Sequence, residues 1–234
     1  SSMWLILNEI MDWDEFHFMA RYLKPGDIVF DIGANIGVYS LWASRFVAGC
    51  GRVYAFEPDP ANFRRCSLQI ELNELGNVVP EQLALADQVG VIGFSQGEDM
   101  MNSIVTNGSP ASSNTIEVIM TTMDLYCKAK DIPRVAFAKI DVEGFEEKVL
   151  QGSLQLLKSK AIDVLQLEFN EQASSRGLDS INTITLLSDC GYQLYRCSGA
   201  DGSLERVSHP LELGHVNLMA IADIESVRGR VKAY

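Results

Sequence analysis

Two carboxylates separated by one residue follow a strongly apolar run in the second half of the chain. They are Asp141 and Glu143, in the segment Lys-Ile-Asp-Val-Glu-Gly at residues 139–144. Alternate side chains of a strand point to the same face, so both carboxylates can meet at one strand end. Their mutual repulsion favours uptake of a proton, as a general base requires. Two alternatives stay open: a divalent cation between the carboxylates, and Glu143 as the cap of the following helix.

A second candidate site is the glycine-containing segment at residues 31–37, Asp-Ile-Gly-Ala-Asn-Ile-Gly. Gly33 allows backbone angles that other residues avoid and lets a ligand approach the main chain, while Gly37 lets the helix start pack closely on the sheet. Asn35 stands where the dinucleotide fingerprint has its second glycine, so the segment is less suited to bind a pyrophosphate. Asp31 instead suits a cationic ligand. The segment therefore predicts a cofactor loop; the alternative is a tight turn that holds no ligand.

A further carboxylate, Glu57, ends the next predicted strand and is followed by Pro58. At this position of a nucleotide-binding α/β fold, an acid can accept hydrogen bonds from both hydroxyls of a ribose. The alternative is an exposed acid at a strand end. Glu57 follows the glycine loop by one helix and one strand, and the two features together are far more specific than either alone.

An alternation of short apolar strands and longer segments of helical period must position these side chains. Strand, helix, strand, helix, strand recurs in the first third, which predicts a parallel sheet with right-handed crossovers. In such a sheet, ligands bind beyond the carboxyl ends of the strands. Strands are expected at residues 27–31, 52–57, 78–84, 135–142 and 162–169.

Residues 88–115 interrupt this alternation with a segment that contains many glycines, serines and asparagines. A loop of this length in a compact domain often acts as a lid or a substrate-binding segment. Near the end, strands expected at 193–197 and 216–222 have no helix between them, so we expect them to pair antiparallel. There is no internal repeat or linker-like composition, and residues 1–234 are predicted to form one domain.

The composition disfavours nucleic acid as a partner and predicts no membrane span. The chain of 234 residues carries a net charge of −12, which repels a phosphate backbone, and it has no basic patch. No apolar run reaches the roughly 18 residues that cross a bilayer, and the first residues do not read as a signal peptide. Five cysteines without a CxxC pair predict free thiols in a reducing, cytoplasmic setting and no zinc site.

Three segments in this order, DIGANIGVYS, AFEPDPANF and KIDVEGFEEKVLQG, closely resemble the FkbM family of class I methyltransferases. The resemblance covers about residues 24–171. It implies a Rossmann-like α/β fold, with helices on both faces of a seven-stranded, mostly parallel sheet whose last strand is antiparallel. It also implies S-adenosylmethionine as cofactor, and methylation of a hydroxyl oxygen on a saccharide or small natural product.

The resemblance also assigns roles to particular residues. It places Asp31, Gly33 and Asn35 around the methionine half of the cofactor, Glu57 on the ribose and Pro58 beside the adenine. The segment before the first strand, residues 1–24, is expected to be helical and to lie over the site, and residues 88–115 are expected to approach the substrate. The cofactor-binding set is Asp31, Gly33, Asn35, Gly37, Glu57, Pro58, Ala84 and Leu85.

For a hydroxyl acceptor, a base must take the proton as the new bond forms. Asp141 is the first candidate, followed by Glu143 and by Glu168 at the end of a predicted strand, where Glu168 could instead cap the next helix. No metal ligand is assigned, although a divalent cation stays an alternative. N-methylation on the same fold, or a cofactor-binding subunit without catalysis of its own, also stays open. A nicotinamide-dependent oxidoreductase is disfavoured because the GxGxxG fingerprint is absent.

Overall fold

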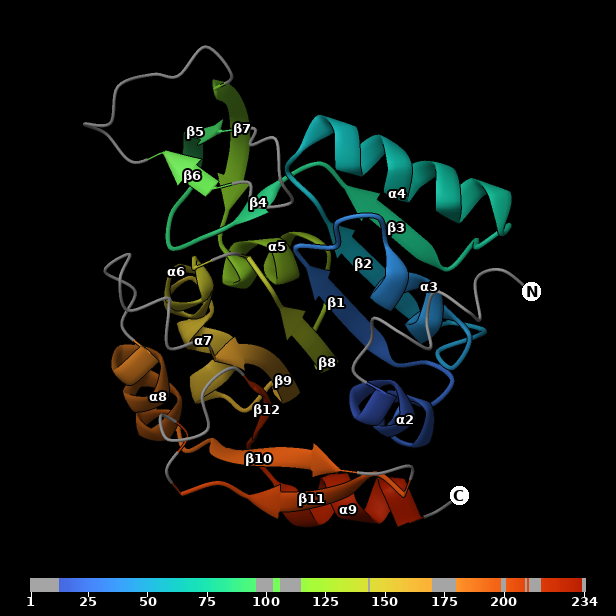
Figure 1. The fold of residues 1–234 in the computed structure, drawn as a ribbon, viewed down its shortest axis with the longest axis vertical. Helices are drawn as coiled ribbons and strands as arrows, with labels where there is room; N and C mark the ends of the chain where they lie inside the picture. The colour runs from blue at the N-terminus through green and yellow to red at the C-terminus, as the bar shows by residue number, and fades with distance from the viewer. Residues whose placement is uncertain are drawn as a thin grey trace.

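The computed structural model describes residues 13–95, 103–105, 115–142, 144–169, 180–198, 201–208, 210 and 216–232. Within them, a main sheet of eight strands has helices on both faces, and a smaller sheet of four strands lies beside it (Figure 1). The order of the main sheet is β11 (Ser203–Arg206), β10 (Gln193–Ser198), β12 (Val216–Ile221), β9 (Ile162–Phe169), β8 (Val135–Ile140), β1 (Ile28–Ile32), β2 (Arg52–Phe56) and β3 (Val78–Glu81).

Most neighbouring strands of the main sheet run parallel. β1 pairs in parallel with β2 and β8, β8 with β9, and β2 with β3. β12 runs antiparallel to both β9 and β10, which confirms the mostly parallel α/β sheet with an antiparallel last strand. β11 was not predicted: it pairs antiparallel with β10 and adds an eighth strand at the edge.

The helices divide between the two faces of the main sheet, and each set covers its own apolar cluster. Helices α2 and α9 also pack against each other at one end of the sheet. On one face lie α2 (Trp13–Tyr22), α3 (Val38–Ser44), α4 (Pro60–Leu72) and α9 (Ile224–Lys232). On the other lie α5 (Met123–Ala129), α6 (Glu146–Gln151), α7 (Leu154–Lys158) and α8 (Ser180–Asp189).

The third strand is shorter than predicted. β3 ends at Glu81, which pairs with Phe56 at the end of β2, whereas the expected strand ran to residue 84. The chain then turns, because the Leu83 N–H donates to the Glu81 carbonyl oxygen at 3.0 Å. Strand β4 (Ala84–Leu85) pairs in parallel with β7 (Thr115–Thr121) and so belongs to the smaller sheet.

The described part of the 88–115 segment completes this smaller sheet. β5 (Gly90–Ser95) pairs antiparallel with β7 and with β6 (Ser103–Val105). The rest of the segment lies outside the described residues.

Local sequence explains where α4 begins. Pro60 is its first residue, and Asp59 caps it by accepting hydrogen bonds from the Ala61 and Asn62 N–H groups, both at 2.8 Å. Proline at the first helical position and aspartate before it are favourable because the first N–H groups have no partner within the helix. The residues Asp59 and Pro60 therefore suit the start of a helix.

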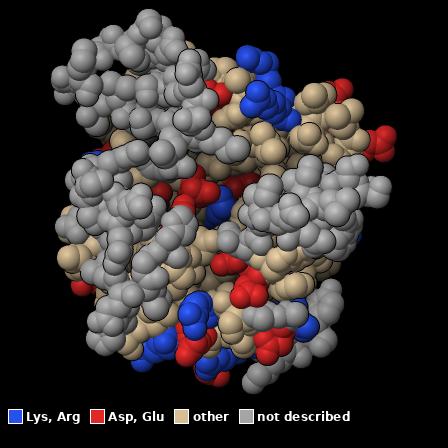
Figure 2. Space-filling view, in the orientation of Figure 1, with Lys and Arg blue, Asp and Glu red and all other residues tan. Residues whose placement is uncertain are grey.

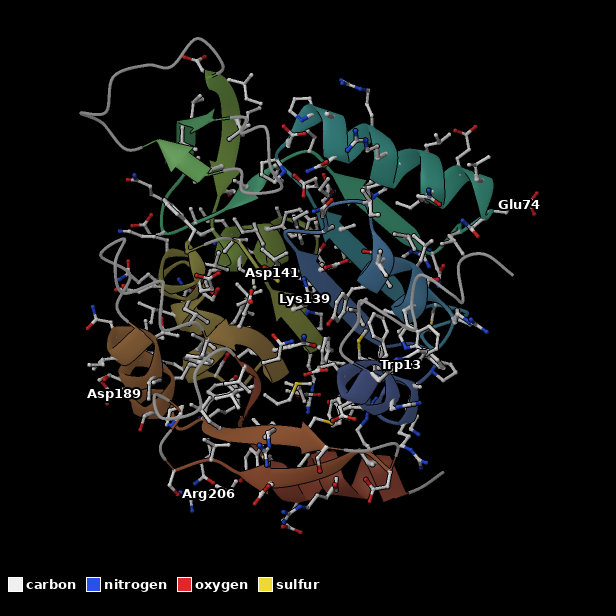
Figure 3. All side chains as sticks on the ribbon, viewed as in Figure 1. Trp13, Glu74, Lys139, Asp141, Asp189 and Arg206 are labelled. Atoms are coloured by element: carbon white, nitrogen blue, oxygen red, sulfur yellow. The ribbon has the colours of Figure 1, made fainter. Side chains whose placement is uncertain are left out.

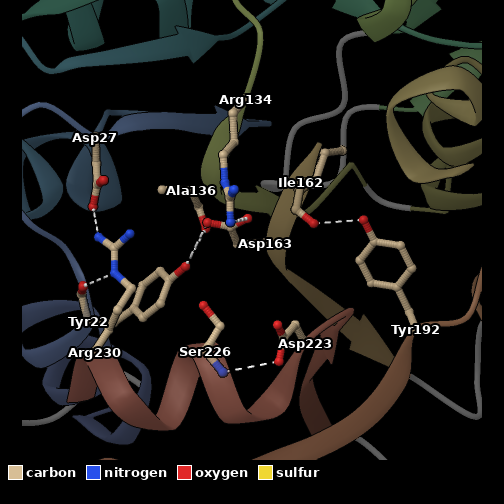
Figure 4. A network of polar contacts seen from close by, with 10 residues as sticks. All are labelled: Tyr22, Asp27, Arg134, Ala136, Ile162, Asp163, Tyr192, Asp223, Ser226 and Arg230. Carbon is tan, nitrogen blue, oxygen red and sulfur yellow. Dashed lines mark hydrogen bonds and ion pairs between the residues drawn. The ribbon is translucent and has the colours of Figure 1, made fainter. Parts of the chain in front are cut away.

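A network of polar contacts ties the end of α2 to the sheet (Figure 4). The Tyr22 hydroxyl lies 3.2 Å from both the Ala136 carbonyl oxygen and Asp163 Oδ2. Asp163 also pairs with Arg134 at 2.6 Å. Burial and the charge of Asp163 raise the pKa of Tyr22, so the hydroxyl stays a donor. Arg230 of α9 lies over the Tyr22 ring, 4.6 Å from its centroid.

We predict that Tyr22→Phe lowers the free energy of unfolding by about 1 kcal/mol, because it removes a buried hydrogen-bonding hydroxyl and leaves the ring in place. Urea unfolding measures the change. Tyr195→Phe is the matched control, since the Tyr195 hydroxyl bonds to the exposed Gln193 side chain. Equal decreases in the free energy of unfolding in the two variants would show that the hydrogen bonds of Tyr22 do not stabilise the fold.

Candidate functional site

The loop after β1 is held between the ends of the two neighbouring strands. The N–H groups of Gly33 and Ala34 both donate to the Phe56 carbonyl oxygen, at 3.0 and 2.9 Å. The Asp141 N–H donates to the Ile32 carbonyl oxygen at 3.0 Å. Gly33 has φ +79°, and a Cβ there would lie 1.8 Å from the Asp141 carbonyl oxygen. Only glycine fits this position, for its backbone angle and for its packing against the end of β8.

Gly37 is also required, although the reason differs from the expected one. Its φ is +88°, and a Cβ would come within 2.8 Å of Cys66 Sγ on α4. The close neighbour of the helix start is therefore α4 rather than the sheet, because the thiol of Cys66 is buried directly against it. Asn35 has φ +51°, a left-handed conformation that asparagine tolerates better than most residues.

Glu57 joins the loop after β1 to the loop after β2. Its Oε2 accepts the Asn35 N–H at 2.7 Å, and its Oε1 accepts the Asp59 N–H at 2.9 Å. The residue is only 5% exposed, so the alternative of an exposed acid at a strand end is wrong. Burial raises the pKa of Glu57 to about 7, although the two N–H groups oppose that change.

Three buried polar side chains form a row across the centre of the main sheet. Asp31 pairs in register with Lys139, and Lys139 with Gln166. Partners in parallel strands point to the same face, so the three side chains lie side by side on β1, β8 and β9. Their exposed fractions are 1%, 8% and 2%. Polar residues this deep in a sheet must be paired with one another or with a ligand.

Lys139 supplies the positive charge of this row. Its Nζ lies 2.7 Å from Asp141 Oδ2 and 4.6 Å from the centroid of the Tyr39 ring. Burial acts to lower the pKa of Lys139, but the charges of Asp141 and Asp31 outweigh it, and the net pKa is raised. The side chain is therefore an ammonium ion that pairs with Asp141 and also feels the charge of Asp31.

Two oxygen atoms of the row have no hydrogen-bond partner among the described residues: Asp31 Oδ1 and Gln166 Oε1. The other atoms of these groups are engaged. Asp31 Oδ2 accepts the Ser40 hydroxyl at 2.6 Å, and Gln166 Nε2 donates to the Tyr39 hydroxyl at 3.1 Å. Burial raises the pKa of Asp31, and Lys139 and Ser40 offset part of that change. Ligand groups that donate hydrogen bonds would satisfy both atoms.

A cavity of about 590 Å³ lies over the Lys139 and Gln166 part of this row, and Asp31 is not among its lining residues. Its volume is in the range of small-molecule sites. Figure 2 shows acidic and basic side chains gathered at the hollow in the middle of this face, and Figure 3 shows Lys139 and Asp141 near the centre with Trp13 at the start of α2. The lining residues are Trp13, Asp14, Glu15, Tyr39, Lys139, Ile140, Asp141, Gln166, Glu168, Arg196, Cys197, Val216 and Asn217.

The structure brings some of the predicted site residues together and separates others. Asp141 and Glu168 line the same cavity, and Asp141 also abuts Gly33. Ala84 and Leu85 are 6% and 3% exposed and belong to apolar clusters outside the cavity lining. Glu143 lies outside the described residues. Pro58 lies in the loop that follows β2, between Glu57 and Asp59, whose N–H donates to the Glu57 carboxylate.

Sequence reasoning overlooked several residues of the cavity. Lys139 belongs to the segment at residues 139–144, and Gln166 interrupts the apolar run of β9. A polar residue within a strand that is otherwise apolar could have indicated a site residue in both cases. Trp13, Asp14 and Glu15 carry no local signal, because only the packing of α2 across the sheet brings them to the cavity.

In the part of the chain that the structure describes, no three His, Cys, Asp or Glu side chains gather closely enough to ligate a metal ion. Across the same residues, no helix has the length and apolar character needed to cross a bilayer.

Comparison with known proteins gives a clear family match. The model of the methyltransferase FkbM domain matches residues 31–194. The hexuronic acid methyltransferase AglP of Haloferax volcanii is 25% identical over 189 residues, which are 80% of this chain and 72% of that protein. The 31-O-demethyl-FK506 methyltransferase FkbM of Streptomyces tacrolimicus is 28% identical over 159 residues, 56% of this chain and 60% of that one.

A solved structure shares the fold. The crystal structure of the methyltransferase FkbM from Methylobacillus flagellatus superposes with a TM-score of 0.54 at 19% identity, over 86% of this chain and 44% of that one. This chain thus spans less than two thirds of the length of that protein and of the Streptomyces enzyme.

The raised pKa of Glu57 predicts a pH-dependent stability. With a pKa of about 7 in the folded protein and 4.5 ordinarily, the folded state holds a proton that the unfolded state loses in this interval. The contribution of Glu57 to the free energy of unfolding is therefore fully present below pH 4.5 and is lost as the pH rises through 7, a change of about 3 kcal/mol.

Thermal unfolding between pH 5 and pH 8 measures this effect. Glu57→Gln should flatten the decline, whereas Glu71→Gln on the exposed surface of α4 should leave it as in the wild type. Parallel pH profiles for the wild type and Glu57→Gln would contradict the assignment.

Proposed function

Since this chain belongs to the FkbM family of S-adenosylmethionine-dependent methyltransferases, we propose that it methylates a hydroxyl oxygen of a saccharide or small molecule. The observation that carries the proposal is the cavity beside the glycine loop, with the Asp141 side chain on its surface and the Asp141 main chain against Gly33. One residue thus borders both the loop expected to hold the methyl donor and the space available for an acceptor.

The residues of the loops fit the proposed cofactor. The ammonium of its amino-acid part would satisfy the unpartnered, buried Oδ1 of Asp31. The carboxylate of Glu57 keeps lone pairs for the two ribose hydroxyls, because each of its oxygens accepts only one backbone N–H in this structure. Pro58 would border the adenine. Ala84 and Leu85 are core residues here, so their proposed contact with the adenine would involve little exposed side-chain surface.

When bound, S-adenosylmethionine supplies a methyl group made electrophilic by its positively charged sulfur. The protein must then hold the acceptor oxygen in line with that group, roughly 3 Å from the methyl carbon, and remove its proton. In our proposal Asp141 takes the proton. The Lys139 ammonium orients the Asp141 carboxylate through Oδ2, and the hydrogen bond from the Asp141 N–H to Ile32 fixes the backbone.

Glu168 is the second candidate for the base, because it lines the same cavity from the end of β9. Glu143 keeps its place as a candidate from its motif alone. The names of the two relatives support oxygen as the acceptor atom, since one describes an O-demethyl substrate and the other a hexuronic acid.

Cofactor binding is the first test. We predict that the wild type binds S-adenosylmethionine and S-adenosylhomocysteine, and that Glu57→Ala weakens both by tenfold or more, about 1.4 kcal/mol, through loss of the ribose contact. Isothermal titration calorimetry measures the affinities, with Glu71→Ala as the control on an exposed carboxylate. A wild type that binds neither compound would remove the basis of the proposed function.

The base is tested separately. We predict that Asp141→Asn leaves the affinity for S-adenosylmethionine within about twofold of wild type and lowers kcat by roughly 10² to 10⁴. S-adenosylhomocysteine release is measured with a hydroxyl acceptor that the wild type uses. Asp87→Asn is the matched control, because Asp87 also pairs with a lysine, Lys148 at 2.8 Å, outside the cavity lining. Normal turnover of Asp141→Asn would transfer the role to Glu168 or Glu143.

A further inference from the structure

The charged side chains around the cavity are mostly acidic. Among the described residues they comprise four carboxylates and two cations. The whole chain is acidic as well, at −12, so the field outside the cavity has the same sign. The carboxylates are Asp14, Glu15, Asp141 and Glu168, and the cations are Lys139 and Arg196.

Both cations are already engaged by carboxylates. Lys139 pairs with Asp141 at 2.7 Å. Arg196 on β10 lies directly opposite Glu205 on β11 in the strand register, and the two side chains pair at 3.1 Å. The eighth strand of the sheet thus supplies the counter-charge of Arg196. Because Lys139 and Arg196 are each paired with a carboxylate, a negatively charged acceptor would gain little from either cation.

One side-chain oxygen in the cavity lining, Oε1 of Gln166, could accept a hydrogen bond from a ligand. Gln166 is 2% exposed, lines the cavity and has an Oε1 without a partner among the described residues. A buried polar atom left in this state is unfavourable, and a ligand O–H or N–H would satisfy it. A carboxylate has no hydrogen to donate, whereas a hydroxyl or an ammonium group has.

The position of Gln166 places it on the acceptor side. It lies on β9. Lys139 is on the neighbouring strand β8, and Asp31, the first residue of the glycine loop, is on β1, two strands away. Its neighbours in the cavity are Glu168 on the same strand and Asn217, which pairs with Glu168 in register on β12. On this side of the cavity, Gln166 Oε1 can accept a hydrogen bond from a ligand hydroxyl, because it has no partner among the described residues.

We infer that the cavity takes a hydroxyl-rich acceptor that is neutral or carries an amine, with Gln166 as a direct hydrogen-bond acceptor, and that it discriminates against acceptors bearing a carboxylate. The inference rests on the proposed function, because it assigns the acceptor side of the same site. It separates this chain from the relative named for a hexuronic acid.

Three probes with the same sugar ring test the charge preference: methyl glucoside, glucosamine and glucuronate. Each is titrated into the full chain saturated with S-adenosylhomocysteine, and binding is followed by ligand-observed NMR. We expect the glucoside and glucosamine to bind and glucuronate to bind at least tenfold more weakly. Glucuronate binding as tightly as the glucoside overturns the inference, as does the failure of all three probes to bind the loaded protein. Failure to bind S-adenosylhomocysteine at all instead refutes the proposed function, and the inference with it.

Two variants identify the residues responsible. Gln166→Leu should weaken the glucoside at least fivefold and leave the affinity for S-adenosylhomocysteine unchanged, which a general loss of folding would not do. Glu205→Gln should release Arg196 and raise the affinity for glucuronate relative to the glucoside by about threefold, the scale of an exposed ion pair. Glu225→Gln is the matched control, since it breaks the exposed pair with Arg228 on α9. An unchanged ratio in Glu205→Gln, or unchanged glucoside binding in Gln166→Leu, contradicts the assignment.

Discussion

The ammonium of Lys139 is the charge on which the centre of this protein depends. Its Nζ pairs with Asp141 at 2.7 Å, and its charge also acts on Asp31, its neighbour in the strand register. Asp31 is 1% exposed, so burying its carboxylate without a positive charge nearby would be very costly. Lys139 therefore lets an acidic residue stay in the centre of the sheet, next to the partly exposed Asp141 at the end of β8.

Around this charge, the ends of three parallel strands are joined by short polar contacts. Glu57 connects the loops after β1 and β2, and the absent side chain of Gly33 lets the Asp141 carbonyl lie against the loop after β1. At the opposite end of the sheet, Tyr22 and Arg230 hold α2, whose first turn walls the cavity. The proposed cofactor and acceptor regions are therefore parts of one framework of strand ends.

Two elements lie at the periphery of the central strands. β11 adds an edge strand that brings Glu205 opposite Arg196, and the smaller sheet takes up the segment after β3. Neither changes the order of the strands that carry Asp31, Lys139 and Gln166.

The sequence by itself determined the features that depend on local chemistry. Gly33 at positive φ, the alternation of strands and helices and the family motifs all follow from neighbouring residues, and the structure or the family match confirms them. Only the tertiary structure decided that Glu57 is buried, that the third strand stops at Glu81, and that Gln166, Arg196 and the first turn of α2 face one cavity. These features rest on strand register and helix packing between residues far apart in the chain, which no local pattern encodes.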